Sequence, residues 1–291
     1  MEICLEHRNV RVDIRHAWTA FSGQDGAIYG DCLFRFDTKG NCTVFSVTEQ
    51  KKLANFTLDK VDILKPHSNA VCFGAERADE SDEFPLLYSN IYNNYAKASD
   101  RLEGVCCVYR LTRNGDSFET KLAQVIKIGF VENTDHWKSG GGIADVRPYG
   151  NFVVDTDNNK LYAFTMRDGE KVTRYFEFDL PALSDGIFRE EYGINVVTLE
   201  VSDIKARFDC EYSRYIQGAC CHDGKIYSVE GFSDEKNPPR MQIIDLAGKE
   251  QYAAIDLWNL GLRIEPEFVD FHNGTLYYLD ASGEVYTFTF Q

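Results

Sequence analysis

The amino-acid sequence predicts an all-β protein built from repeated four-stranded antiparallel units. Runs of four to eight apolar and aromatic residues recur along the chain, and Asp-Gly or Asn-Gly turns separate several of them. The 16 Tyr and 20 Phe agree with this class, because aromatic side chains suit the half-buried face of a pleated sheet. Helical spacing is scarce, and short helical turns are expected only at 181–193 and 89–102.

The C-terminal half contains the clearest hairpins. Residues 218–232 comprise two apolar runs on either side of an Asp-Gly turn, and residues 267–280 repeat the pattern around Asn-Gly. Residues 151–166 follow the same plan with a longer Asp/Asn turn. Third and fourth strands are predicted after these hairpins, at 173–181, 195–201, 240–248, 251–258 and 284–290.

The N-terminal half repeats the four-strand plan twice. The first unit has predicted strands at 24–29, 32–37, 42–47 and 51–58. The second unit has predicted strands at 69–74, 86–92, 104–111 and 118–130, with polar loops at 75–84 and 132–146. Recurring units of this size indicate a repeat architecture, in which each unit buries its faces against its neighbours.

The five units predict a single domain with the architecture of a five-bladed β-propeller. The fifth unit has only three strands before residue 291, and the strand-like segment 3–14 is expected to supply the missing strand and close the ring. The blades are expected at 24–60, 67–131, 147–200, 214–257 and 264–291, the last completed by 3–14. A six-bladed ring is the alternative if the second unit holds two blades, and a β-sandwich is the third choice.

Charge and composition narrow the set of partners. With 31 basic and 46 acidic residues the formal net charge is -15, and this field repels phosphate backbones and anionic membranes. Neither nucleic acid nor a membrane is therefore expected as a partner, and no run approaches the roughly 20 apolar residues of a membrane span. A signal peptide is not expected, because the first residues lack a basic segment followed by a long apolar run, and the nine cysteines contain no Cys-x-x-Cys pair. Buried free thiols in a reducing cytoplasm are the expectation.

No metal site and no cofactor are expected. The segment 155–160 lacks the spacing to a twelfth-position glutamate that a calcium loop requires, and it falls where the other units have a hairpin turn. The glycine-rich segment 138–146 lacks the lysine and Ser/Thr of a phosphate-binding loop.

Candidate site residues cluster at the starts of the innermost strands. These strands line the central channel of a propeller, so polar residues at their starts converge on one mouth, and a concave site with a few convergent polar groups is typical of ligand binding. The predicted ligand-binding residues are Gln24, His67, Asn69, Arg147, Tyr149, Asn151, Gln217 and Glu265. The predicted catalytic residues, should the protein be an enzyme, are Glu267, Asp25 and Glu230.

Short motifs resemble those of known five-bladed propellers. Residues 215–232, with their Gln-Gly opening, short turn and aromatic return strand, resemble the inner hairpin of plant-type glutaminyl cyclases. Residues 67–74 and 264–271 resemble strand starts of TagC and phage receptor-binding propellers, which carry His-x-Asn and Glu-Pro-Glu elements. The resemblance implies the propeller fold, and cyclase activity as one alternative. The chain departs from these patterns at Phe268, where glycine is expected, and at Phe232, where the cyclases have tryptophan.

Three functions are consistent with these residues. Binding of a polar, carbohydrate-like small molecule or glycan is favoured, because the predicted mouth holds more amides than acids and an aromatic ring can stack on a sugar. A glycoside hydrolase would use the carboxylates of Glu267, Asp25 and Glu230. A glutaminyl-cyclase-like transferase is the third alternative, and the sequence alone does not decide whether the protein is an enzyme.

Overall fold

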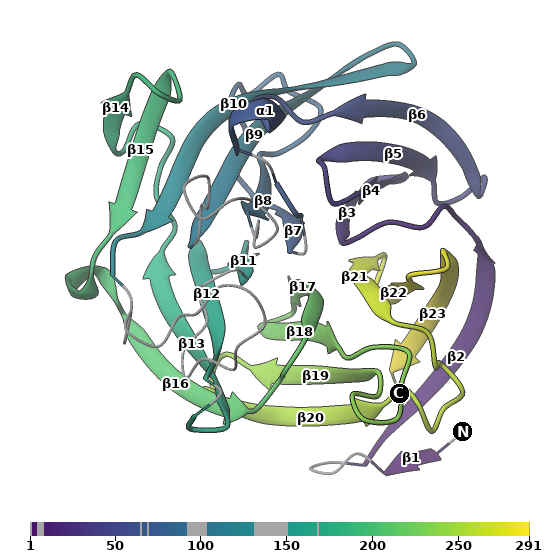
Figure 1. The fold of residues 1–291 in the computed structure, drawn as a ribbon. Coiled ribbons are helices and arrows are strands. Elements are labelled where there is room, and N and C mark those ends of the chain that lie inside the picture. The colour runs from purple at the N-terminus through teal and green to yellow at the C-terminus, as the bar shows by residue number, and fades with distance from the viewer. Residues whose placement is uncertain are drawn as a thin grey trace.

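Five antiparallel sheets surround a central axis in the computed structural model (Figure 1). The structure describes residues 2–4, 9–64, 66–68, 70–91, 104–130, 151–167 and 169–290. The innermost strands contact one another in ring order, from the first sheet through to the fifth and back to the first. The predicted all-β fold class, a propeller of five blades, is confirmed.

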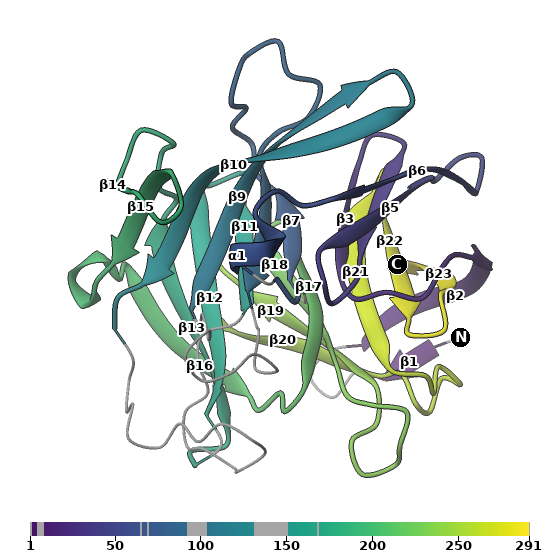
Figure 2. The same cartoon turned by 45° about the horizontal axis from the view of Figure 1, so that its top comes forward.

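The first two sheets follow the predicted strand order. The first sheet contains β3 (Gly26–Tyr29), β4 (Cys32–Phe36), β5 (Asn41–Ser46) and β6 (Lys51–Thr57). The second sheet is built on β7 (Val71–Phe73), β8 (Leu87–Ile91), β9 (Val105–Asn114) and β10 (Ser117–Ile128). A short helix, α1 (Val61–Leu64), connects the two sheets. The β9–β10 hairpin extends beyond the ring at its outer edge (Figure 2).

The other three sheets complete the ring. The third contains β11 (Asn151–Asp155), β12 (Lys160–Arg167), β13 (Val172–Asp179) and β16 (Ala206–Glu211). The fourth contains β17 (Ile216–His222), β18 (Lys225–Glu230), β19 (Arg240–Asp245) and β20 (Glu250–Asp256). The fifth contains β21 (Pro266–His272), β22 (Thr275–Asp280), β23 (Glu284–Phe290), β2 (Asn9–Thr19) and β1 (Glu2–Cys4).

The N-terminal strand closes the fifth sheet, as predicted. β2 pairs antiparallel with β23, from Val12 opposite Phe290 to Thr19 opposite Glu284 (Figure 1). The strand continues beyond the predicted limit at residue 14, and β1 folds back on its outer side. This pairing joins two distant parts of the chain and leaves the ring without an open seam.

The predicted fourth strand of the third blade is wrong. Residues 195–201 form most of β15 (Ile194–Leu199), which pairs in parallel with β10 of the second sheet, and β16 takes the expected place beside β13. The long outer strand β10 offers an unpaired edge, and the parallel partner covers it. The segment 181–193, expected to hold a helical turn, instead contains β14 (Ile187–Arg189), which pairs with β15.

The other expected helical turn is only partly described. Residues 89–91 belong to β8, and 92–102 lie outside the described residues. The described helices are α1 and a short 3-10 turn at Val201–Asp203. Among the described helices, none has the length and apolar composition needed to cross a bilayer.

Aromatic side chains and thiols fill the space between the blades. The ring of Phe34 lies 5.5 Å from that of Phe73 and 5.5 Å from that of Phe84, so residues of the first and second sheets pack edge to face. Tyr175 stacks between Phe164 and Phe208, at 5.0 and 5.2 Å. All eight cysteines with described side chains are free, and seven of them are buried. The predicted role of the cysteines as buried free thiols is confirmed for these seven.

The innermost strands approach one another closely at the axis. A Cβ atom on Gly218 would lie 2.8 Å from the Glu267 backbone oxygen and 2.9 Å from Asp25 Oδ1, so only glycine fits there. Asp25 itself is fully buried, and its Oδ2 accepts hydrogen bonds from the backbone N–H of Val71 (2.9 Å) and Ala219 (3.4 Å). One carboxyl group therefore links the first, second and fourth blades.

The close approach at Gly218 predicts a large effect of a small substitution. Gly218→Ala should lower the free energy of unfolding by about 1–3 kcal/mol, because the added methyl group forces neighbouring backbone to move. Urea denaturation followed by circular dichroism measures this change. Gly224→Asn, in the turn of the same hairpin, is the control, since nothing lies within 4 Å of that position and Asn tolerates its positive φ. Equal stability of both variants would contradict the tight axis.

Candidate ligand site at the mouth of the channel

The innermost strands share an irregularity near their starts. The pairing of β17 with β18 shifts its register on either side of Gln217, and the pairing of β21 with β22 does so on either side of Glu267. In the first sheet, Gln24 N–H donates to Phe36 O (2.7 Å) and Phe36 N–H donates to Asp25 O (3.1 Å). Gln24 and Asp25 therefore both lie opposite Phe36, which is a bulge of the same kind. Such bulges re-aim a side chain. Gln24, Gln217 and Glu267 therefore occupy the same structural position in three blades.

Hydrogen bonds connect these side chains across neighbouring blades. The His67 imidazole Nε2 donates to Gln24 Oε1 (3.0 Å), and Gln24 Nε2 donates to Glu267 Oε1 (3.2 Å). Gln217 Nε2 donates to Glu265 Oε1 (2.6 Å). The structure thus brings five of the predicted site residues together at one end of the channel, from the second, first, fifth and fourth blades.

Burial disfavours the charged forms of several side chains at this end of the channel. It raises the pKa of Glu267 to about 8, although the charge of Arg35 lowers that pKa; the neighbouring Glu265 raises it further. Burial also raises the pKa of Glu265 and lowers the pKa of His67. Near neutral pH, Glu267 is therefore mainly a protonated acid and His67 a neutral imidazole.

Arg35 is a charged neighbour of Glu267 that the sequence analysis did not predict. It lies on β4, is 2% exposed, and its Nη2 donates to the backbone oxygens of Gly23 (2.8 Å) and Asp280 (3.2 Å). Burial lowers the pKa of Arg35 to about 10. Among the neighbouring acids, Glu267 has the largest opposite effect and raises that pKa. The sequence signal was present, since Arg35 is the one charged residue in the apolar run 32–36.

Two of the three predicted catalytic carboxyls are held by backbone donors. Glu230 Oε2 accepts a hydrogen bond from Arg214 N–H (3.1 Å), and Glu230 Oε1 accepts one from Gln242 Nε2 (2.7 Å) within the same blade. Asp25 forms the axial link described above, and burial raises its pKa well above the usual range. Glu267 differs from both, because the hydrogen bond to its carboxyl group comes from a side chain and not from a backbone N–H group; its Oε2, like Asp25 Oδ1, has no partner among the described residues.

The third blade contributes Asn151 to the same end. Asn151 is the first residue of β11, it is 3% exposed, and its Oδ1 has no hydrogen-bond partner among the described residues. The predicted ligand-binding residues Asn69, Arg147 and Tyr149 lie outside the described residues.

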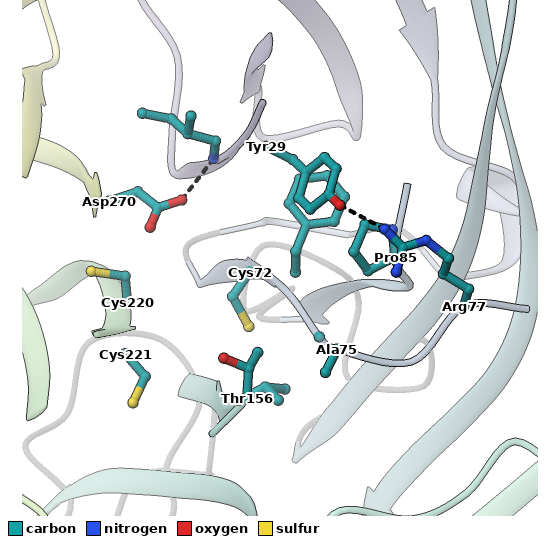
Figure 3. Close-up of a pocket in the computed structure, with 13 residues that line it drawn as sticks. Tyr29, Cys72, Ala75, Arg77, Pro85, Thr156, Cys220, Cys221 and Asp270 are labelled. Atoms are coloured by element: carbon teal, nitrogen blue, oxygen red, sulfur yellow. Dashed lines mark hydrogen bonds between the residues drawn. The ribbon is translucent and has the colours of Figure 1, made fainter. Parts of the chain in front are cut away.

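A cavity of about 350 Å³ occupies the opposite mouth, where the innermost strands end (Figure 3). Its lining includes Tyr29, Cys72, Arg77, Cys220, Cys221 and Asp270. Asp270 is on β21, three residues after Glu267, and was not among the predicted site residues. In the sequence, Asp270 is marked only as an acid in the otherwise apolar run 268–271, and an acid at an outward-facing strand position gives the same pattern.

Comparisons with known proteins bear on the fold. No protein-family model matches the chain, and no curated protein matches it. Among solved structures, the glutaminyl cyclase of Myxococcus xanthus has a TM-score of 0.51 and 12% sequence identity, over 97% of this chain and 98% of that one. The chain is a five-bladed β-propeller. The predicted resemblance to glutaminyl cyclase propellers is thereby confirmed at the level of the fold.

Two further solved structures are more distant. Hydrazine synthase of Kuenenia stuttgartiensis has a TM-score of 0.40 and 9% identity, over 87% of this chain and 60% of that one. Sqt1 of Saccharomyces cerevisiae has a TM-score of 0.40 and 7% identity, over 89% of this chain and 55% of that one.

The raised pKa of Glu267 predicts a pH-dependent stability. The unfolded pKa of a glutamate is about 4.3, so the folded chain holds a proton at Glu267 that the unfolded chain releases, and the unfolding free energy falls as pH rises from about 5 through 8. Glu267→Gln should make this fall shallower, by an amount on the order of a few kcal/mol near pH 8. Urea denaturation at several pH values measures it.

The matched control for this experiment is Glu250→Gln, at an exposed position of β20. That variant should follow the wild-type curve at every pH. Parallel curves for wild type and Glu267→Gln would refute the assignment of the proton to Glu267.

Proposed function

We propose that the chain binds an uncharged, hydroxyl-rich small molecule of carbohydrate-like chemistry at the mouth where the innermost strands begin. The observation that carries this proposal is the series of side-chain hydrogen bonds from His67 through Gln24 to Glu267, with Gln217 and Glu265 beside it. These groups come from four blades and are half-buried or buried, so they form a preorganised polar surface rather than scattered polar residues.

The chemistry of the surface favours hydroxyl groups as ligands. Amides such as Gln24 and Gln217 donate and accept hydrogen bonds, and a protonated Glu267 donates as well as accepts. Glu267 Oε2 and Asn151 Oδ1 have no partner among the described residues, and buried polar atoms are normally hydrogen-bonded. A sugar hydroxyl satisfies both kinds of group, because it donates one hydrogen bond and accepts others.

The low charge of the surface selects against ionised ligands. With Glu267 and His67 mainly neutral near pH 7, the positive charge beside Glu267 among the described residues is that of Arg35, which is almost completely buried and therefore poorly accessible to an incoming anion. The net charge of -15 adds a long-range repulsion. A neutral saccharide or polyol avoids both costs.

A thermal-shift screen tests this proposal. The panel contains neutral mono- and disaccharides and N-acetylhexosamines, with hexuronates and hexosamines as charged counterparts. Neutral members should raise the melting temperature, because a ligand that binds only the folded state stabilises it by mass action. Gln24→Ala and Gln217→Ala should each weaken the binding of a hit about fivefold to tenfold, while Glu250→Gln leaves it unchanged. Failure of every neutral saccharide to stabilise the protein would refute the carbohydrate assignment.

The pH dependence of binding isolates the role of Glu267. If its proton is donated to the ligand, wild-type affinity should fall about tenfold for each pH unit above about 8, where Glu267 ionises. Glu267→Gln keeps a donor at every pH and should abolish this dependence, as titration calorimetry between pH 6 and 9.5 would reveal. The same fall in both proteins would mean that another group titrates.

Acid–base catalysis by Glu267 is the second candidate function. A pKa of about 8 is close to working pH, which is the condition for an efficient proton donor or acceptor. Glycoside cleavage would pair Glu267 with the neighbouring Glu265, since Asp25 and Glu230 are held by backbone donors. A glutaminyl-cyclase-like reaction would use the same acid. The solved structure of similar fold is named a glutaminyl cyclase, and this likeness concerns the fold.

Turnover assays separate the enzyme from the binding protein. Aryl glycosides and peptides with N-terminal glutamine are the two substrate sets. An enzyme should lose on the order of 10²-fold or more in turnover on Glu267→Gln, whereas a binding protein shows no turnover in either form.

A further inference from the structure

We propose that the opposite mouth of the channel is a separate binding site for a small zwitterion that carries an ammonium and a carboxylate group at the two ends of a short hydrocarbon chain, as an ω-amino acid does. The cavity there places the carboxyl group of Asp270 on one side and the guanidinium group of Arg77 on the other, with thiol and aliphatic groups between them (Figure 3). Its volume of about 350 Å³ lies at the small end of the range for small-molecule sites. This proposal does not depend on the function proposed for the other mouth.

The two mouths are separated by the closed centre of the ring. Asp270 follows Glu267 by three residues along β21, which is roughly 10 Å of extended chain. Between these levels lie the fully buried Asp25 and the contact at Gly218, where even one added carbon atom would meet its neighbours at 2.8 Å. A ligand in one mouth therefore does not reach the polar groups of the other.

Asp270 presents a carboxyl group to which no cationic side chain of the described residues donates a hydrogen bond. Its Oδ2 accepts from Ile28 N–H (2.6 Å) and its Oδ1 from Phe271 N–H (2.8 Å), so the hydrogen bonds that reach it from the described residues come from neutral backbone. Each carboxylate oxygen has two lone pairs, which leaves acceptor positions for an ammonium group. Burial raises the pKa of Asp270 to about 7, and a bound ammonium would favour its charged form.

Arg77 is held in place by neutral partners on the other side of the cavity. Its Nη2 donates to the Tyr29 hydroxyl (2.7 Å), as Figure 3 shows, and its Nε donates to the backbone oxygen of Asp82 (3.1 Å). The carboxylate of Asp82 is paired with Arg110 instead (2.6 Å). The guanidinium group thus keeps its charge and further N–H donors for an incoming carboxylate, which it binds better than a point cation does.

The thiols of the cavity act as apolar wall and not as reactive groups. Burial raises the pKa of Cys72 to about 12, and it raises the pKa of Cys220 and Cys221 as well, so all three stay protonated. Within the described part of the chain, no group of three His, Cys, Asp or Glu side chains is arranged to hold a metal ion. The thiols, with Val154, therefore provide a surface for the hydrocarbon part of the ligand.

The charge around the cavity sets the orientation of the ligand. An adjoining hollow, which shares Thr156 and Cys221 with the cavity, is lined by Asp155, Asp157 and Asp223. These acids favour a positive group on the Asp270 side. The carboxylate of the ligand is thereby directed to Arg77 and Tyr29, away from the acids.

Matched probes test whether both charges of the ligand are recognised. 5-Aminopentanoate, pentylamine and pentanoate share the same straight chain and carry, in that order, both groups, the ammonium alone and the carboxylate alone. Titration calorimetry and thermal shift on the full chain, with 4-aminobutanoate as a shorter zwitterion, should show binding of the zwitterions and at least about tenfold weaker binding of each single-charge probe. Binding of pentylamine as strong as that of 5-aminopentanoate would overturn the zwitterion assignment.

Variants assign each charge to its residue. Asp270→Asn and Arg77→Gln should each weaken the binding of the best zwitterion about tenfold or more. Asp270→Asn should also weaken the binding of the amine probe, and Arg77→Gln should weaken the binding of the carboxylate probe. Asp256→Asn and Arg15→Gln, at exposed positions, are the controls and should bind as the wild type does. The melting temperature without ligand shows that each variant is folded. No stabilisation by any ω-amino acid, or equal binding by wild type and both cavity variants, would overturn the proposal.

Discussion

The carboxyl group of Asp25 holds the centre of the ring together. In a β-propeller the hydrogen-bonded ladder ends at the inner edge of each blade, and the unpaired N–H groups of that edge need acceptors. Asp25 supplies one acceptor to Val71 and Ala219 in two other blades, and Asp270 supplies one to Ile28 in the first blade. Acids placed on the axis thus connect the first, second, fourth and fifth sheets through hydrogen bonds at the centre of the ring.

The same arrangement makes the two mouths of the channel chemically different. Because the centre is closed, each mouth is shaped by its own residues. The mouth at the strand starts has amides and acids whose pKa values are raised by burial, so it is polar and its Glu267 is mainly protonated near neutral pH. The mouth at the strand ends has an acid and a guanidinium group on opposite sides of a cavity lined with thiols. One fold therefore offers two surfaces that suit different ligands.

Local signals in the sequence were enough to predict the blades. Turn pairs, alternation and the surplus N-terminal strand each act over a few residues, and the repeat placed polar side chains at the strand starts. The parallel partner of β10 could not be predicted, because pairing between strands far apart in the sequence leaves no local mark. The sequence did not predict Arg35, Arg77 and Asp270 as site residues for a related reason, because the closure of the ring decides what each side chain faces. A charged residue in an apolar run indicates either an outward-facing position or a buried site, and the sequence does not distinguish them.

The closing strand has a consequence for how the protein is made. His16 and Glu284, which are paired across β2 and β23, are 268 residues apart. During synthesis the ribosome delivers the first blades long before β23 emerges, so the growing chain passes through an open arc whose two ends expose unpaired strand edges. Such edges can pair with another nascent chain. The emergence of β23 therefore completes the ring and also ends the period in which these strand edges are exposed.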